Sequence, residues 1–391
     1  MKLFVIASRI PYPLEKGDKL RIYHQVKELS KNNEVLLCCL HESSIPKEAK
    51  SELQKICKQV EFVRLSKWKI PFNMLLAFFT SKPFQVAYFY QKKAQRKIDK
   101  LIHSFKPDFI YSQLIRTSEY VKHFYAIPKT IDYMDSFSKG MERRAENARF
   151  IPRMIFDSEA KRLLRYENLI FDYFDNHSII SAQDRDSIWH ENRNKISIIP
   201  NGLDAEFFHP KEQKKHYQIL FSGNMSYIPN VDAAIYLAKE IFPIVKKEII
   251  DCTLLIAGAN PVAKIEALAS DSITVSGWMN DIREAYWDSQ VFVAPLRLGS
   301  GLQNKLLEAM ATKTPSVTSS LANNALGAAD RSEILIATNT NDFAKEIIYL
   351  LKNPEEANKI ADKAYTFVTS TYDWEKSTKK LELVIQGLSR D

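Results

Sequence analysis

Four apolar segments in the second half of the chain each end at glycine, and this pattern constrains the fold more than any other feature. The segments are followed, in chain order, by Gly223, Gly258, Gly277, and the pair Gly299 and Gly301. The 391 residues include only 10 glycines, so we expect each to meet a backbone requirement. In parallel α/β sheets, ligands bind at the carboxyl ends of the strands, where backbone approaches them closely. The set therefore predicts a ligand site, although any one of these glycines alone is typical of a simple turn.

The first half of the chain alternates apolar runs with segments of helical periodicity. The apolar runs lie at 2–8, 35–40, 60–65 and 109–112, and segments such as 20–30 between them place apolar residues at helical spacing. Repeated strand–helix–strand units of this length predict a parallel sheet covered on both faces. A polar, proline-containing stretch at 200–217 then predicts a linker. We expect an α/β protein with a first domain at 1–200 and a second at 201–371.

The composition excludes several classes of protein. Hydrophobic residues make up 45% and charged residues 26% of the chain, as in ordinary soluble domains. The four cysteines lack disulfide or zinc-ligand spacing, which favours a reducing compartment, and we expect a cytoplasmic protein. The net charge of +8 suits an anionic partner. Because the basic residues are spread along the chain, nucleic acid is the least favoured partner, and we expect none.

The sharpest local motif is the segment 297–311, where a strand gives way to a helix. Lys305 is predicted in the first turn of that helix, where the helix dipole disfavours a cation by ~0.3–1 kcal/mol. Together with Arg297 and the free backbone N–H groups of the first turn, it would concentrate positive potential that suits a phosphate or diphosphate. Glu308, one turn later, is placed to accept hydrogen bonds from a ribose diol. Taken alone, Lys305 and Glu308 are more typical of an exposed i,i+3 pair.

Other nucleotide motifs are absent from the sequence. There is no G-x-x-x-x-G-K-[ST], and no G-x-G-x-x-G follows the first apolar run, which weighs against an ATPase and a nicotinamide dehydrogenase. Asp184 and Asp186 form a D-x-D, but they open a predicted helix, where acidic residues are common. We therefore predict no metal site.

The chain resembles glycosyltransferase family 4. The residues that carry the resemblance are 293–296 with 299–311, Pro200–Asp204, 220–225 and 256–258, 275–278 with Asp281, and the segment 9–21. The resemblance implies the GT-B fold, in which two Rossmann-like parallel-sheet domains face each other across a cleft. It also implies that a C-terminal helix in 372–391 crosses back to the first domain.

The resemblance further implies a retaining glycosyltransferase of the hexosyltransferase type. It would take a nucleoside-diphosphate sugar as substrate, need no metal or other cofactor, and act on a glycan or lipid-linked acceptor in polysaccharide biosynthesis. The implied catalytic residues are Arg297 and Lys305. The implied donor-binding residues are Gly223, Asn224, Gly277, Trp278, Gly299, Ser300, Gly301, Leu302 and Glu308. The acceptor-side candidates are Gly17, Asp18, Lys19, Arg21, Asp132 and Asp135.

Two departures from the family pattern leave alternatives open. Ser300 stands where the family often has a glutamate that contacts the donor sugar, and Gly223-Asn224 stands where many members have Gly-Arg. A sugar-nucleotide epimerase of the same architecture and a non-catalytic nucleotide-sugar or glycan-binding protein are the rival interpretations. The aromatic and apolar stretch 70–90 fits a peripheral contact with the inner face of a membrane, or buried packing.

Overall fold

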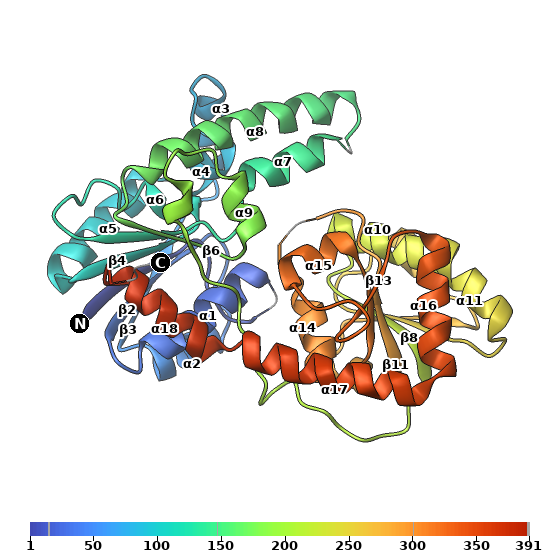
Figure 1. Cartoon of the computed structure of the whole chain (residues 1–391). Helices are drawn as coiled ribbons and strands as arrows, with labels where there is room; N and C mark the ends of the chain where they lie inside the picture. Colours follow the sequence, from blue (N-terminus) through green and yellow to red (C-terminus); the bar gives the residue numbers. More distant parts are fainter. Residues whose placement is uncertain (15, 147, 300, 389–391) are drawn as a thin grey trace. The chain divides into compact units, whose positions relative to one another are not determined.

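The computed structural model describes residues 1–14, 16–146, 148–299 and 301–388, and the chain divides into two compact units (Figure 1). The first unit combines Met1–Gly202 with the C-terminal segment that begins at Trp374. The second unit is Leu203–Asp373. Each unit has a parallel sheet with helices on both faces, so the predicted α/β class is confirmed.

The sheet of the first unit has the strand order β3-β2-β1-β4-β5-β6-β7, and every neighbouring pair is parallel. Its strands are β1 (Lys2–Ala7), β2 (Glu34–His41), β3 (Gln59–Arg64), β4 (Phe109–Gln113), β5 (Lys129–Asp132), β6 (Asn176–Ile179) and β7 (Ser197–Ile198).

The strands at the centre of this sheet are apolar on both faces because both faces are covered by helices. In β1, Phe4 and Ile6 belong to one buried cluster, while Leu3 and Val5 belong to the other. The two cysteines of β2, Cys38 and Cys39, are divided between the same two clusters and form no disulfide. The continuous apolar runs of the sequence are thus explained by a two-sided core.

Ten α-helices and one short 3-10 helix, η1 (Arg193–Lys195), belong to the first unit among its described residues. The α-helices are α1 (Gly17–Leu29), α2 (Ala49–Ile56), α3 (Lys69–Phe78), α4 (Phe84–Phe89), α5 (Lys92–Phe105), α6 (Ile115–Ser118), α7 (Phe137–Glu146), α8 (Phe150–Phe171), α9 (Ala182–Ser187) and α18 (Trp374–Ile385). The C-terminal helix α18 lies against α1, where the Trp374 ring stacks on His24 with 4.8 Å between ring centroids. The predicted return of the C-terminal helix to the first unit is confirmed.

The sheet of the second unit has the order β10-β9-β8-β11-β12-β13, again entirely parallel. Its strands are β8 (Tyr217–Ser222), β9 (Leu254–Ala257), β10 (Ile273–Gly277), β11 (Ser289–Ala294), β12 (Ser316–Ser319) and β13 (Leu335–Ala337). The four strands predicted from the glycine pattern are β8 to β11. Strand order reverses between β8 and β11, which is where such sheets bind ligands.

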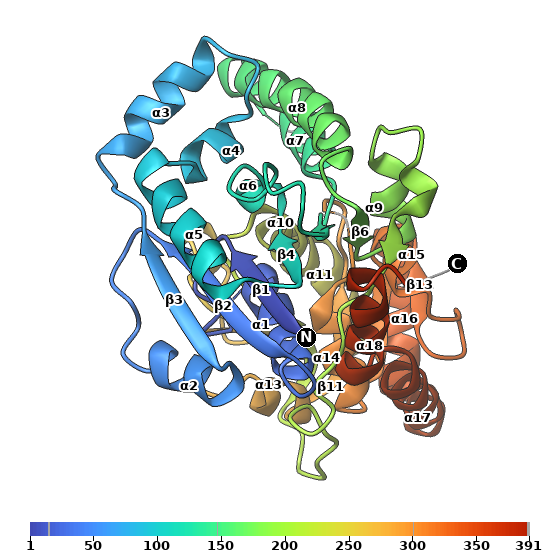
Figure 2. The same ribbon diagram turned by 90° about the vertical axis from the view of Figure 1, so that its left-hand side faces the viewer.

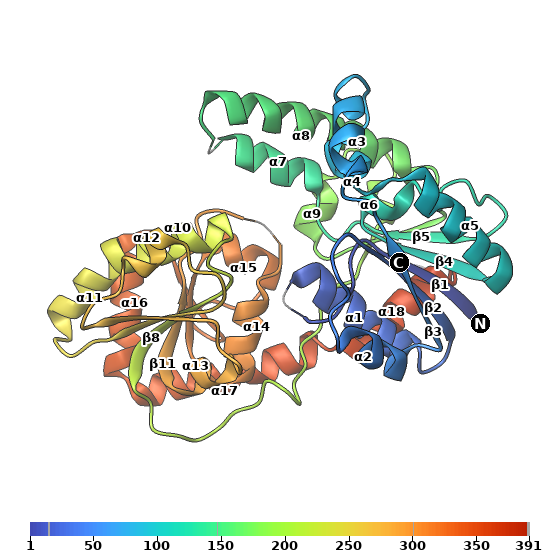
Figure 3. The same cartoon turned by 180° about the vertical axis from the view of Figure 1, so that it is seen from behind.

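Helices cover both faces of this second sheet. They are α10 (Ile228–Tyr236), the π-helical segment η2 (Leu237–Ile241), α11 (Phe242–Glu248), α12 (Ala263–Glu266), α13 (Arg283–Trp287), α14 (Asn304–Ala311), α15 (Ser320–Leu326), α16 (Thr340–Lys352) and α17 (Pro354–Thr371). Figure 3 shows α10 and α11, in yellow, along one side of the strands, with α17 along the other. Among the described residues, no helix combines the length and the apolar composition needed to span a bilayer.

Candidate functional site

Lys305 lies in the first turn of α14, at the carboxyl end of β11, as the sequence predicts. The side chain is buried, and its Nζ donates a 2.5 Å hydrogen bond to Asn230 Oδ1 at the start of α10. The same Nζ lies 4.7 Å from the centroid of the Phe221 ring. Burial lowers the pKa of Lys305 to about 7, and the negative charge of Glu308 opposes that shift.

The Lys305 ammonium has no carboxylate at ion-pair distance within the described part of the chain. A buried ammonium without a charged partner is costly, and strongly perturbed titratable groups of this kind cluster at functional sites. The N–H groups of the first turn of α14 add partial positive charge at the same place. The site is therefore suited to an anion.

Close backbone packing shapes the edge of this site. A Cβ atom added at Gly258 would lie 2.0 Å from the carbonyl oxygen of Gly223, and one at Gly223 would lie 2.6 Å from Nδ2 of Asn230. That Nδ2 donates to the carbonyl of Asn224 at 3.0 Å, so Asn230 links the turn after β8 to Lys305. Gly223 and Gly258 are therefore required by close backbone packing, as the small number of glycines predicts.

Glu308 is held by a chain of hydroxyl groups. Tyr286 of α13 donates a 2.7 Å hydrogen bond to Glu308 Oε2, and its hydroxyl also lies 2.7 Å from Oγ of Ser222 at the end of β8. Burial raises the pKa of Glu308, while the Tyr286 hydrogen bond and the charge of Lys305 lower it. Because Glu308 retains some exposed surface, the carboxylate can still accept hydrogen bonds from a ligand.

Arg297 points toward α10, where its guanidinium forms a two-bond pair with Asp232. The Nε–Oδ2 and Nη2–Oδ1 distances are 3.1 and 2.9 Å, and the guanidinium lies 4.1 Å from the ring centroid of Tyr236. Glu240 lies 3.9 Å away from it. The charge of Arg297 is thus already balanced, unlike that of Lys305. Its predicted contact with a diphosphate requires release from Asp232 and stays a prediction.

The remaining donor candidates lie on loops at the same edge of the sheet. Gly277 ends β10, and the neighbouring Trp278 has an exposed ring. Gly299 and Gly301 have φ angles of 102° and 78°, which favour glycine, and with Leu302 they lie in the loop between β11 and α14. Ser300 lies outside the described residues.

Two of the acceptor-side candidates are structural. Arg21 of α1 and Asp132 of β5 have no exposed surface and pair through Nε–Oδ2 and Nη2–Oδ1 contacts of 2.7 and 3.0 Å. Arg21 Nη1 also donates to the Ile199 carbonyl and to Asn201 Oδ1. Complete burial gives these two residues a role in positioning α1 against β5, and their predicted place on the acceptor side stays a prediction.

The other acceptor-side candidates lie at the carboxyl ends of β1 and β5. Asp18 pairs with Arg9 at 2.8 Å, close to Gly17 and the partly exposed Lys19 at the start of α1. Burial, together with Asp184 and Asp132 nearby, raises the pKa of Asp135 to about 7. This edge of the first sheet therefore carries both an ion pair and a carboxyl group that titrates near neutrality.

Comparison with known proteins agrees with this architecture. Residues 216–353, which lie wholly within the second unit, match the family model described as Glycosyl transferases group 1. The second unit is similar to a group 1 glycosyltransferase domain. The matched residues include Gly223, Lys305 and Glu308.

Full-length relatives extend the comparison to both units. An uncharacterized 44.6 kDa protein in the cps region of Klebsiella pneumoniae is 26% identical over 96% of this chain and 97% of its own. The solved sucrose-phosphate synthase of Thermosynechococcus elongatus has a TM-score of 0.72 at 14% identity, over 99% of both chains. Anabaena HepE, solved in complex with UDP, has a TM-score of 0.66 at 13% identity, over 99% of this chain and 100% of its own. The GT-B fold is thereby confirmed, and the group 1 match supports a glycosyltransferase.

Sequence reasoning did not find several residues of this glycosyltransferase-like site. Asn230, which binds Lys305, and Tyr286, which holds Glu308, are distant in sequence and follow no motif. Asp232, the partner of Arg297, lies in α10, and nothing in the sequence links it to Arg297. Among the described residues, no group of three or more His, Cys, Asp or Glu side chains is arranged to hold a metal ion.

Proposed function

We propose that this protein is a retaining glycosyltransferase of family 4 that transfers a hexose from a nucleoside-diphosphate sugar to a glycan or lipid-linked acceptor. The group 1 match in the second unit and the GT-B fold of the whole chain support glycosyl transfer. A relative encoded in a cps region supports a role in polysaccharide biosynthesis. The proposal includes a cytoplasmic location with a peripheral contact at the inner face of a membrane.

The buried, carboxylate-free ammonium of Lys305 is the observation that carries the proposal. A donor diphosphate placed there would supply the missing negative charge. During transfer, the leaving diphosphate gains negative charge while the sugar becomes cationic. A fixed ammonium and the N-terminus of α14 stabilise that developing charge without reorganisation. The proposal includes no metal or other cofactor, because this ammonium and the helix N-terminus would supply the positive charge.

Glu308 is the proposed ribose-binding group. The Tyr286 hydroxyl fixes one carboxylate oxygen and leaves the other to accept from a ribose diol. The exposed ring of Trp278, after β10, is the proposed edge of the base-binding region. With a retaining mechanism in which the departing phosphate takes the acceptor's proton, no strong protein base is required.

A binding experiment tests the donor site directly. Nucleoside diphosphates of each base, beginning with UDP, would be screened by thermal shift and then by calorimetry. We expect one base to raise the melting temperature. Lys305→Gln should abolish that shift, while the matched control Lys359→Gln, an exposed lysine of α17, should retain it. A chain that binds no nucleoside diphosphate, or a Lys305→Gln variant that binds as well as wild type, contradicts the proposal.

Product analysis then separates transfer from its rivals. The corresponding sugar nucleotide would be incubated alone and with extracted glycan or lipid-linked acceptors. Transfer requires an acceptor and yields free nucleoside diphosphate. A new sugar nucleotide formed without an acceptor identifies an epimerase, and binding without turnover on any acceptor identifies a non-catalytic protein.

A further inference from the structure

The excess of basic over acidic residues in this chain arises in one segment of the first unit. Residues 62–98 contain eight lysines and arginines and no aspartate or glutamate, so the segment carries a formal charge of +8. This equals the net charge of the whole chain. The rest of the sequence therefore sums to zero net charge, so this segment carries the chain's whole excess of positive charge.

The same segment contains an apolar helix whose outer side is uncovered in its unit. Ile70 and Ala77 of α3 face inward and are buried. The Trp68 side chain is 93% exposed, and five further large apolar side chains are each at least half exposed: Phe72, Leu75, Leu76, Phe78 and Phe79. An ordinary surface helix is polar on its outer face, whereas no residue from 70 to 81 is charged.

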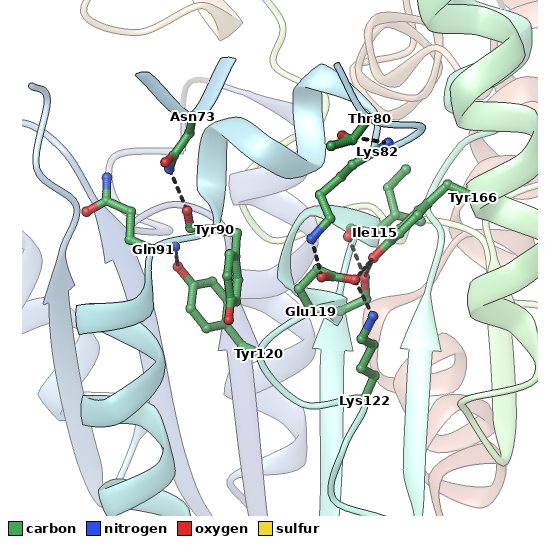
Figure 4. Close-up of polar contacts among 11 residues, drawn as sticks. Asn73, Thr80, Lys82, Tyr90, Gln91, Ile115, Glu119, Tyr120, Lys122 and Tyr166 are labelled. Carbon is green, nitrogen blue, oxygen red and sulfur yellow. Dashed lines mark hydrogen bonds and ion pairs between the residues drawn. The ribbon is translucent and has the colours of Figure 1, made fainter. Parts of the chain in front are cut away.

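The outer face of α3 is fixed in place by polar contacts on the inner side. Asn73 Nδ2 donates to the Tyr90 carbonyl at 2.8 Å, and Lys82 pairs with the buried Glu119 at 2.5 Å (Figure 4). Arg162 of α8 donates to four carbonyls between Ala77 and Lys82, at 2.5 to 3.2 Å. Figure 2 shows α3 at the rim of the first unit, with α4 and α5 on its inner side. These contacts hold the apolar side chains outward.

Exposed lysines border the apolar surface. Lys67 and Lys69 flank Trp68 at the start of α3. Lys92 and Lys93, which begin α5 in the same segment, are also exposed. Aromatic and aliphatic side chains on one face with lysines at its border are the features of a helix that lies in the headgroup region of a bilayer.

We infer that α3, with its flanking residues Trp68 and Phe79, inserts into the surface of a membrane that contains anionic lipids. A second copy of the chain is a poorer occupant, because an isologous contact would oppose one +8 segment with another. Each exposed lysine gains electrostatic attraction at an anionic leaflet, and the apolar side chains leave water. The inference deepens the proposed membrane contact and does not depend on glycosyl transfer.

Vesicle partition of the full chain tests this inference. Vesicles with phosphatidylglycerol would be compared with vesicles of phosphatidylcholine alone, by cosedimentation and by the fluorescence of Trp68. We expect binding to the anionic vesicles that weakens with added salt, and a blue shift that Trp68→Phe removes. The triple variant Phe72→Ser/Leu75→Ser/Phe79→Ser should bind the anionic vesicles at least about tenfold more weakly than wild type.

A matched control removes an equal exposed apolar group elsewhere on the same unit. Phe150, Ile151 and Met154 at the start of α8 are all exposed, and replacing them with serine should leave vesicle binding unchanged. The inference is overturned if wild type ignores anionic vesicles, if both triple variants bind alike, or if sedimentation shows a dimer that only the α3 variant loses. Nucleotide binding in solution, measured on the same variants, reports on the proposed function separately.

Discussion

Burial of the Lys305 ammonium lowers the stability of the folded chain, but it also places a positive charge where an anion can bind. The pKa is about 7 in the folded chain and 10.5 in the unfolded chain. Below pH 7 both states bind the proton, and the full cost of burying the charge is present. From pH 7 to 10.5 the unfolded state binds more protons, so wild-type stability rises with pH, by ~1.4 kcal/mol per unit at most.

Lys305→Met should therefore be more stable than wild type in acid. We expect an advantage of a few kcal/mol at pH 6 that shrinks steadily between pH 7 and 10, because the variant has no ammonium to bury. Urea unfolding of both proteins at pH 6 and pH 9 measures the difference. Equal stability of the two at pH 6 would show that the ammonium is not desolvated.

Anion binding at Lys305 should be coupled to proton uptake. A bound diphosphate raises the pKa of the ammonium, so above pH 7 the protein must take up a proton to bind its ligand. We expect affinity for the nucleoside diphosphate to fall by up to about tenfold per unit as the pH rises above 7. Calorimetry at pH 8 in two buffers of different ionisation enthalpy measures the proton count. Binding that releases protons, or exchanges none, would contradict this coupling.

At the scale of single elements, α13 positions the carboxylate of α14. Tyr286→Phe removes the hydrogen bond to Glu308 and leaves the ring packing intact. We expect a loss of ~1 kcal/mol in unfolding free energy and a several-fold weaker affinity for the nucleotide. The measurement compares the nucleotide with its 2′,3′-dideoxy form: wild type should prefer the ribose, and the variant should discriminate less. An unchanged preference would mean that Glu308 does not bind the diol.

The elements differ in how well the sequence predicts them. Strands β8 to β11 are apolar runs that stop at glycine, so their ends are marked in the sequence. Helices α16 and α17 look like one amphipathic stretch, but the chain turns at Asn353, because Pro354 cannot continue a helix. The exposed face of α3 could not be predicted, since periodicity does not distinguish a buried apolar helix from an uncovered one.

At the scale of the whole molecule, repeated local pattern predicts the architecture, while the candidate site depends on long-range pairs. Lys305 and Glu308 stand out by their place in a helix and by family resemblance. Their partners Asn230 and Tyr286 are brought to them only by the sheet order, which places β8 beside β11. The partner of Arg297 is equally distant in sequence, because Asp232 comes from α10.

The return of α18 to the first unit predicts that the two units depend differently on the C-terminus. A chain ending at Asp373 loses Trp374 from its stack on His24, and it loses the buried side chains Leu381, Val384 and Ile385, worth ~1.5–3 kcal/mol each. We expect calorimetry to show the first unit melting earlier, while the second unit, Leu203–Asp373, keeps its transition and its nucleotide affinity. A control chain ending at Leu388 should melt as the full chain does. If truncation at Asp373 weakened nucleotide binding and left the melting of the first unit unchanged, α18 would stabilise the second unit and the prediction would be wrong.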